Sequence, residues 1–272
     1  MSLDRLPLTP SSATSEFFAR AIVRAPSLNF AAGLTTVNLG APDYKRAVEQ
    51  YKAYCAALER CGLSLIRLKS DARYPDSTFV EDTAVLTERG AILARPGAAS
   101  RAGEVQGIKP LLAESYSELH SICEPGTLDG GDVCEAGRHF FIGLSERTNE
   151  AGAQQLTELL ATFGYSASCV DIRGMKNILH LKSGLAYLGD KRLVVIEPLA
   201  NREQFPGYEL VRVNAREQYA ANCVRLNGRV LVAAGHPDFE NALQRLGYQT
   251  LALEMSEFQK MEGGLSCLSL RF

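Results

Sequence analysis

The sequence predicts an α/β protein in which about five strand–helix modules form a ring. One supporting observation is an amphipathic stretch that ends at a glycine and is followed by a β-rich run, a pattern that recurs along the chain. The other is a hairpin signal that recurs roughly every 40 to 50 residues. One module of this size cannot bury its own apolar face, so such modules close into a ring or stack. A doubly wound sheet would also alternate strands with helices, but the periodicity favours the ring.

Helices are expected wherever apolar residues recur at helical spacing. The three stretches that end directly before a glycine are 43–61, 150–163 and 239–246. A glycine at this position supplies the left-handed residue that ends a helix, and a run typical of a strand follows each one. Two weaker copies are expected, at 103–113, where the glycine is missing, and at Gly207, before the run 209–214.

Hairpins are expected between these helices. The paired runs are 84–86 with 91–94, 133–135 with 140–143, 185–188 with 193–196, and 223–226 with 230–233. Each connecting turn contains glycine, and Asn227-Gly228 is the strongest two-residue hairpin signal. A fifth unit would pair the two ends of the chain, 21–25 with 265–271, so that residues 1–272 form a single domain.

Composition and charge exclude several classes of protein. Hydrophobic residues make up 46% and charged residues 22%, and the net charge of −2 offers no basic surface to nucleic acid or anionic lipid. No apolar run reaches the ~18 residues of a membrane helix, residues 1–20 are polar, and the seven cysteines lack a CxxC spacing. We therefore expect a cytoplasmic protein that acts on a small molecule, without nucleic-acid or membrane partners.

In a ring, the loops at equivalent strands meet near the axis, and here these loops carry unusual polar residues. Cys267 follows two glycines that allow a ligand to approach the backbone closely, and a lone cysteine with a distant histidine is a candidate nucleophile. His180 has apolar neighbours and is either a satisfied core histidine or a tuned acid/base. No pair of histidines or cysteines has metal-ligand spacing, so no metal is expected.

Carboxylates are the second unusual feature. Glu81 and Asp82 interrupt a β-rich apolar run, and Asp129 lies beside two glycines. Turns or helix caps would explain each one alone, but several buried carboxylates need cations, and a guanidinium matches carboxylates bidentately. Arg101 and Arg147 occupy matching places after two hairpins, where they are either solvated or a clamp for an α-carboxylate. A ligand with both groups is an arginine.

Ordered motifs run along nearly the whole chain. They lie at 33–35, 75–82, 95–101, 127–132, 143–149, 180–188, 219–222 and 262–272. In these motifs the chain resembles the dimethylarginine dimethylaminohydrolases of the guanidine-modifying (pentein) superfamily. The resemblance implies the pentein fold, a five-module pseudo-symmetric α/β propeller, and hydrolysis of asymmetric dimethylarginine or monomethylarginine to citrulline and a methylated amine, without a cofactor. A homodimer is a further expectation.

The same resemblance implies a role for each matching residue. Cys267 would be the nucleophile, His180 the general acid/base, and Asp129 the acid that orients His180, although some relatives carry the longer Glu there. Asp82 would hold the guanidinium nitrogens with Glu81 supporting, and Phe79 would line the site. Arg101 and Arg147 would bind the α-carboxylate, Asp76 the α-amine, and the backbone of Leu34 and Met261 would close over the substrate. The loop 33–40 is expected to act as a lid.

Two other functions remain open at this point. An arginine deiminase or an amidinotransferase would use similar catalytic residues, although those families generally have longer chains. A non-catalytic binding protein on the same fold, such as a ribosome anti-association factor, would leave Cys267, His180 and the carboxylates unexplained.

Overall fold

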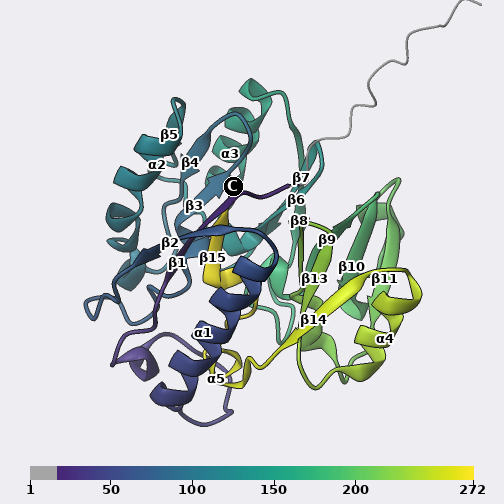
Figure 1. Ribbon diagram of the computed structural model, residues 1–272. Helices are drawn as coiled ribbons and strands as arrows, with labels where there is room; N and C mark the ends of the chain where they lie inside the picture. The colour runs from purple at the N-terminus through teal and green to yellow at the C-terminus, as the bar shows by residue number, and fades with distance from the viewer. Residues whose placement is uncertain (1–16) are drawn as a thin grey trace, which may run out of the picture.

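The computed structural model describes residues 17–272 and arranges them in three-stranded sheets, each built on one plan (Figure 1). The middle strand is antiparallel to one neighbour and parallel to the next strand of the chain on the other side. The antiparallel neighbour is a hairpin partner except in the sheet that pairs the two ends of the described chain. The sheets are β15 (Ser269–Arg271), β1 (Arg20–Arg24) and β2 (Ser64–Leu68); β3 (Ala84–Leu86), β4 (Ala91–Leu93) and β5 (Leu119–Ser121); β6 (Val133–Ala136), β7 (His139–Leu144) and β8 (Ser166–Asp171); β9 (Leu185–Gly189), β10 (Arg192–Ile196) and β11 (Glu209–Val213); β12 (Val224–Leu226), β13 (Arg229–Ala233) and β14 (Gln249–Leu253).

A parallel pair needs a crossover connection, and helices make most of the crossovers. They are α1 (Tyr44–Arg60), α2 (Lys109–Ser115), α3 (Glu150–Thr162) and α4 (Pro237–Arg245), with a further short helix, α5 (Ser256–Gln259). Between β10 and β11 the structure has only two 3-10 turns, at Glu197–Leu199 and Arg202–Gln204. The weak helix signal before Gly207 therefore marks a helix-free crossover. Pro198 and Pro206 lie in that short connection, and proline disfavours a continuous helix.

Helix α1 shows how the sequence sets an element. The side chain of Asp43 accepts a hydrogen bond from the backbone N of Arg46 at 2.8 Å and caps the helix. Tyr54 and Leu58 are fully buried on the inner face, and Gly62, with φ of +91°, ends the helix as predicted. Burying this apolar stripe holds the helix against its sheet.

The two ends of the described chain meet in one sheet, as the sequence predicts. β1 pairs antiparallel with β15, with Ala21 opposite Arg271 and Val23 opposite Ser269. In Figure 1 the purple first strand lies beside the yellow last strand. This pairing builds one module from the two ends of the described chain. No helix between residues 17 and 272 is long and apolar enough to cross a membrane.

Five 3-10 turns, each directly before a hairpin or its closing strand, gather where the modules meet. They are η2 (Val80–Thr83), η5 (Gly130–Asp132), η6 (Leu181–Ser183), η9 (Gln218–Ala221) and η10 (Ser266–Leu268). Hydrogen bonds join each turn or its flanking residue to the next: Gly131 N to Asp82 Oδ1 at 2.8 Å, Leu181 N to Asp132 Oδ1 at 2.9 Å, Asn222 Nδ2 to Lys182 O at 2.9 Å, Ser266 N to Asn222 Oδ1 at 2.9 Å, and Ser266 Oγ to Glu81 Oε2 at 2.6 Å. The ring is thus closed by polar contacts between segments far apart in sequence.

Candidate active site

One small cavity lies against these turns and collects most of the predicted site residues. It is lined by Leu34, Asp76, Phe79, Asp82, Arg101, Arg147, Leu179, His180, Met261, Glu262, Gly263 and Cys267. Asp129 lies behind His180, and Glu81 lies elsewhere. The cavity measures about 20 Å³, room for little more than one water, so a larger ligand requires a wall to move.

Cys267 lies in η10, and two glycines make its position possible. A Cβ at Gly264 would lie 2.5 Å from Cγ of Asn222, and one at Gly263 would overlap the ring of Phe79. The backbone N of Gly264 donates to Sγ of Cys267 at 3.4 Å. Burial, together with the carboxylates of Glu81 and Asp82, raises the pKa of the Cys267 thiol to about 12. The thiol is therefore neutral near pH 7 unless a cation binds beside it.

His180 precedes η6 and is buried. Its Nε2 lies 3.1 Å from Oδ2 of Asp129, so the shorter acid does reach the imidazole. Burial alone would lower the pKa of His180, but Asp82, Asp132 and Asp129 outweigh it and raise the pKa to about 9. The ring is therefore protonated near pH 7. Asp129 is bound to Nε2, so Nδ1 is the other ring nitrogen.

Gly130 and Gly131 separate Asp129 from Asp132, and Gly131 leaves room for the imidazole of His180. A Cβ at Gly131 would lie 2.7 Å from Nδ1 of His180, so a side chain there would displace the ring. Oδ1 of Asp129 accepts from the backbone N of Gly97 at 2.9 Å, which fixes the carboxylate. Burial alone would raise the pKa of Asp129, but the bond and charge of His180 outweigh it and lower that pKa.

Arg101 is engaged more fully than the sequence suggests. Its Nη1 donates to Oδ2 of Asp82 at 2.6 Å, and its Nε and Nη2 donate to the carboxylate of Glu104 at 3.0 and 2.8 Å. Nη2 also donates to the backbone O of Phe79 at 3.1 Å. Sequence reasoning missed the buried Glu104, although its i,i+3 spacing from Arg101 is a usable signal. One guanidinium is thus shared between two carboxylates.

The predicted lid, residues 33–40, contributes Leu34 to the lining of this cavity. The backbone N of Leu34 donates to both carboxylate oxygens of Asp76 at 3.1 Å, and Thr36 Oγ1 donates to Glu262 at 2.9 Å. Leu34 is 39% exposed, so one side of this loop faces the outside. A few hydrogen bonds hold the loop over the cavity, and its motion stays a prediction.

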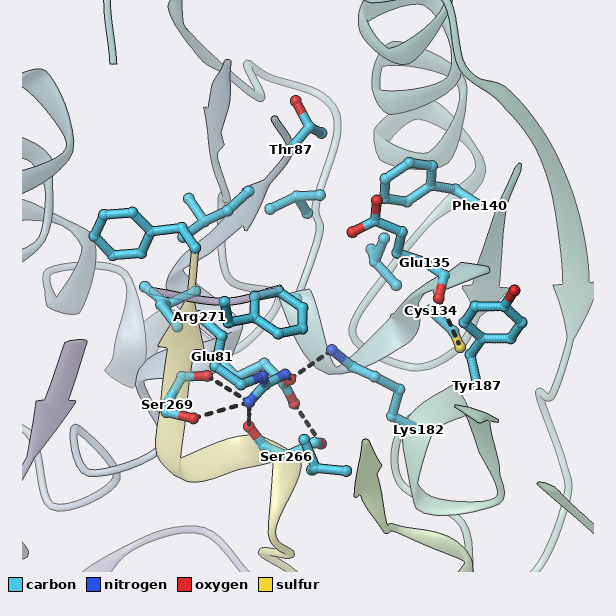
Figure 2. Close-up of a pocket in the computed structure, with 18 of the residues that line it drawn as sticks. Glu81, Thr87, Cys134, Glu135, Phe140, Lys182, Tyr187, Ser266, Ser269 and Arg271 are labelled. Atoms are coloured by element: carbon cyan, nitrogen blue, oxygen red, sulfur yellow. Dashed lines mark hydrogen bonds and ion pairs between the residues drawn. The ribbon is translucent and has the colours of Figure 1, made fainter. Parts of the chain in front are cut away.

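Glu81 faces away from this cavity, into a second one described below (Figure 2). It lies 2.6 Å from Nζ of Lys182 and 2.9 Å from Nη2 of Arg271, and neither cation was predicted as part of a site. Glu81 therefore does not line the reaction cavity, and its expected supporting role at the substrate guanidinium stays a prediction. Neighbours in a 3-10 turn point in different directions, and the sequence pattern did not indicate which of the two acids faces inward.

Asp82, Asp129 and His180 offer ligand atoms within 4.8 Å of one another, a grouping that their spacing in the sequence did not reveal. These atoms are already engaged, because Asp82 binds Arg101 and Asp129 binds His180. The donor set therefore resembles an ion-pair network more than a metal site.

Comparison with known proteins gives consistent matches. A family model described as N,N dimethylarginine dimethylhydrolase, eukaryotic, matches residues 42–227. The N(G),N(G)-dimethylarginine dimethylaminohydrolase of Pseudomonas aeruginosa is 41% identical over 94% of this chain and 100% of its own length. The protein of the same name from Streptomyces coelicolor is 36% identical over 93% of this chain and 96% of its own.

Solved structures match equally well. The Pseudomonas aeruginosa protein, a cysteine-to-serine variant in complex with citrulline, covers 94% of this chain and 100% of its own with 41% identity and a TM-score of 0.90. A histidine-to-glycine variant of a dimethylarginine dimethylaminohydrolase, carrying an adduct with S-methyl-L-thiocitrulline, gives 40% identity, the same coverage and a TM-score of 0.91. The N-terminal domain of ArgZ shares the fold at 19% identity, with a TM-score of 0.81. The five-module propeller predicted from the sequence is confirmed.

Proposed function

This chain belongs to the dimethylarginine dimethylaminohydrolase family, and we propose that it hydrolyses asymmetric dimethylarginine and monomethylarginine to citrulline and dimethylamine or methylamine. The observation that supports this most is the meeting of a thiol, an imidazole–carboxylate pair and a further carboxylate at one enclosed cavity: Cys267, His180 with Asp129, and Asp82. A guanidinium is the planar cation that suits this set.

Binding follows from the charges around the cavity. We place the substrate guanidinium on Asp82, where it would share the carboxylate with Arg101. The α-carboxylate would lie against Arg147, with Arg101 as a second partner, and the α-amine against Asp76. Two ends held in this way fix the guanidinium carbon against Sγ of Cys267, which makes the attack effectively unimolecular.

The reaction begins when the cationic substrate lowers the thiol pKa, and Cys267 releases its proton to solvent. The thiolate attacks the guanidinium carbon, and protonated His180 donates its proton to the methylated nitrogen as the C–N bond breaks. The amine leaves and a thiouronium remains on Cys267. Neutral His180 then takes a proton from water, and the hydroxide attacks the same carbon. The C–S bond breaks as the hydroxyl proton of the adduct passes to sulfur, which gives citrulline and restores the Cys267 thiol.

The test is citrulline release from asymmetric dimethylarginine, monomethylarginine and arginine, measured in parallel. We expect turnover of the methylated substrates that disappears in Cys267→Ala and is unchanged in Cys123→Ala, since Cys123 is an exposed cysteine outside the cavity. Turnover of arginine alone would assign a deiminase. No turnover of any of the three would favour a binding protein.

The expected homodimer and cytoplasmic location remain predictions. Mass photometry at micromolar concentration decides the first, because a homodimer has twice the 29.6 kDa of the chain. A single species of 29.6 kDa would remove it.

A further inference from the structure

Behind the turns that carry the reaction cavity lies a second, larger cavity, which we call the axial channel (Figure 2). Its volume is about 490 Å³, within the range of pockets that bind small organic molecules. Aromatic side chains form much of its wall: Phe17, Phe18, Tyr116, Phe140, Tyr165, Tyr187 and Phe272. The channel thus offers aromatic surface to a ligand, and it shares no lining residue with the reaction cavity.

The floor of the axial channel is an ion cluster of three side chains. Glu81 lies 2.6 Å from Nζ of Lys182 and 2.9 Å from Nη2 of Arg271. Figure 2 shows both cations converging on this carboxylate, with Ser266 below it. Lys182 and Arg271 keep 16% and 15% side-chain exposure, whereas Glu81 keeps 4%. Glu81 also lines the channel, but the two cations present more of their surface to an occupant than the carboxylate does.

Counting charges at this floor gives a net positive site. Two cations share one carboxylate, and a lysine ammonium has three N–H donors, so Lys182 can bind a second acceptor while it holds Glu81. A carboxylate in this position would gain charge-assisted hydrogen bonds in an enclosed place, where they are stronger than in water.

Other charged residues line the axial channel and limit what can bind. Glu135 and Glu88 lie along the wall with Arg225. Burial and the charge of Glu88 raise the pKa of Glu135 to about 7, so near neutral pH this group opposes an anion only in part. A dianion would meet stronger repulsion than a monoanion. The apolar wall likewise favours an occupant with an apolar body.

We propose that the axial channel is a binding site for an amphipathic monocarboxylate, with the carboxylate on Lys182 and Arg271 and the apolar body between the aromatic side chains. This site is distinct from the reaction cavity and does not depend on the function proposed above. The two cavities share a wall, because Glu81 adjoins Asp82 and Ser266 adjoins Cys267.

Octanoate is the test ligand, with octanol and octylamine as matched probes of the same chain length. Binding is measured by NMR titration and calorimetry at pH 8 on the full chain. We expect octanoate to bind with a Kd on the order of 1 mM or tighter, given its ten heavy atoms, and both matched probes to bind more weakly. Equal binding of octanol would overturn the proposal, because only the apolar wall would then matter, and so would the absence of octanoate binding.

Two variants give opposite signs, which structural damage alone would not. Lys182→Met should weaken octanoate binding about tenfold or more. Glu135→Gln should strengthen it several-fold at pH 8, since it removes an opposing charge. Lys52→Met, on the exposed face of α1, is the matched control and should change nothing. If Lys182→Met fails to fold by circular dichroism, Glu135→Gln decides alone, and unchanged or weaker binding there rejects the site.

Octanoate could instead bind in the reaction cavity through Arg147. Arg147→Met separates the two places, because Arg147 lines the reaction cavity and not the axial channel. Octanoate binding that survives Arg147→Met supports the channel site, and binding that is lost there overturns it. Because the readout is binding, a failure of the proposed hydrolysis would not affect this result.

Discussion

Glu81 and Asp82 are neighbours in one 3-10 turn, yet they face two cavities of opposite character. On the reaction side, Asp82 and Glu104 share the single guanidinium of Arg101. On the channel side, Lys182 and Arg271 share the single carboxylate of Glu81. The first cluster carries one excess negative charge and the second one excess positive charge. The number of acidic relative to basic side chains in each cluster thus determines the charge of the ligand that each cavity attracts.

Both clusters are buried, and buried charges require partners. Measured over the whole residue, Asp82, Glu104 and Glu81 are each no more than 3% exposed. Neutralising Glu81 would leave both Lys182 and Arg271 without their carboxylate. Neutralising Asp82 would leave Arg101 still paired with Glu104. The two changes should therefore lower the free energy of unfolding by different amounts. The following substitutions test this difference, in order of the expected effect.

The largest effect is expected on activity, and only on the reaction side. Asp82→Asn removes the carboxylate that we place against the substrate guanidinium and should lower kcat/KM about 1000-fold. Glu81→Gln, one residue away, should lower it less than about tenfold if Glu81 makes no substrate contact. Steady-state citrulline release measures both. Equal losses of kcat/KM would mean that both carboxylates contribute to the reaction, and would contradict the assignment of the two acids to two separate cavities.

The next effect, on stability, should have the reverse order. Glu81→Gln leaves Lys182 and Arg271 without their shared carboxylate and should lower the free energy of unfolding by on the order of 3 kcal/mol. Asp82→Asn leaves Arg101 bound to Glu104 and should cost about 1 kcal/mol. Urea unfolding compares them, with the exposed Glu49→Gln as control. A larger loss in Asp82→Asn contradicts the assignment of partners.

The pH dependence belongs to the reaction side. The pKa of His180 rises from its ordinary value of 6.5 to about 9 in the folded chain. Its contribution to stability is therefore complete below pH 6.5 and is lost as the pH rises through 9. We expect the free energy of unfolding to fall between about pH 6.5 and pH 9 and to level off above pH 9. At saturating substrate, kcat should fall as His180 loses the proton needed by the leaving amine. His180→Asn should remove this pH dependence of the free energy of unfolding. If the pH dependence is unchanged in the variant, other titrating groups cause it.

The smallest effect should come from Glu104, which acts through Arg101. Glu104→Gln removes one sharer of the guanidinium, so Arg101 should bind Asp82 more strongly and compete with the substrate. We expect KM to rise about tenfold while kcat changes little, and Glu104→Asp to recover part of the loss. A fall in kcat at constant KM would show instead that Glu104 affects the reacting atoms.

The sequence predicted the repeating plan of the fold well because its signals are local. Glycine stops and hairpin turns marked most helices and hairpins within a few residues, and the pairing of 21–25 with 265–271 followed from module counting. The helix-free crossover before β11 was ambiguous, since a glycine followed by a strand run resembles the end of a helix.

Within the site, sequence reasoning succeeded for residues that line one cavity and failed for those that depend on partners. Cys267 and His180 were found from unusual neighbours, and both line the reaction cavity. Glu104, Lys182 and Arg271 look like ordinary surface charges in the sequence. Only the fold shows that Glu104 is paired with Arg101 and that Lys182 and Arg271 are paired with Glu81. The orientation of Glu81 could not be predicted for the same reason.

The antiparallel pairing of β1 with β15 also orders events during synthesis. Strand β15 follows directly after η10, the turn that holds Cys267. A ribosome-bound chain that extends only to β14 therefore lacks both η10 and β15. Earlier modules can form while the chain is still emerging, but the contact of greatest sequence separation waits for the last residues. The nucleophile is therefore delivered by the segment that completes the ring, so an incomplete ring has no reactive thiol to place beside His180.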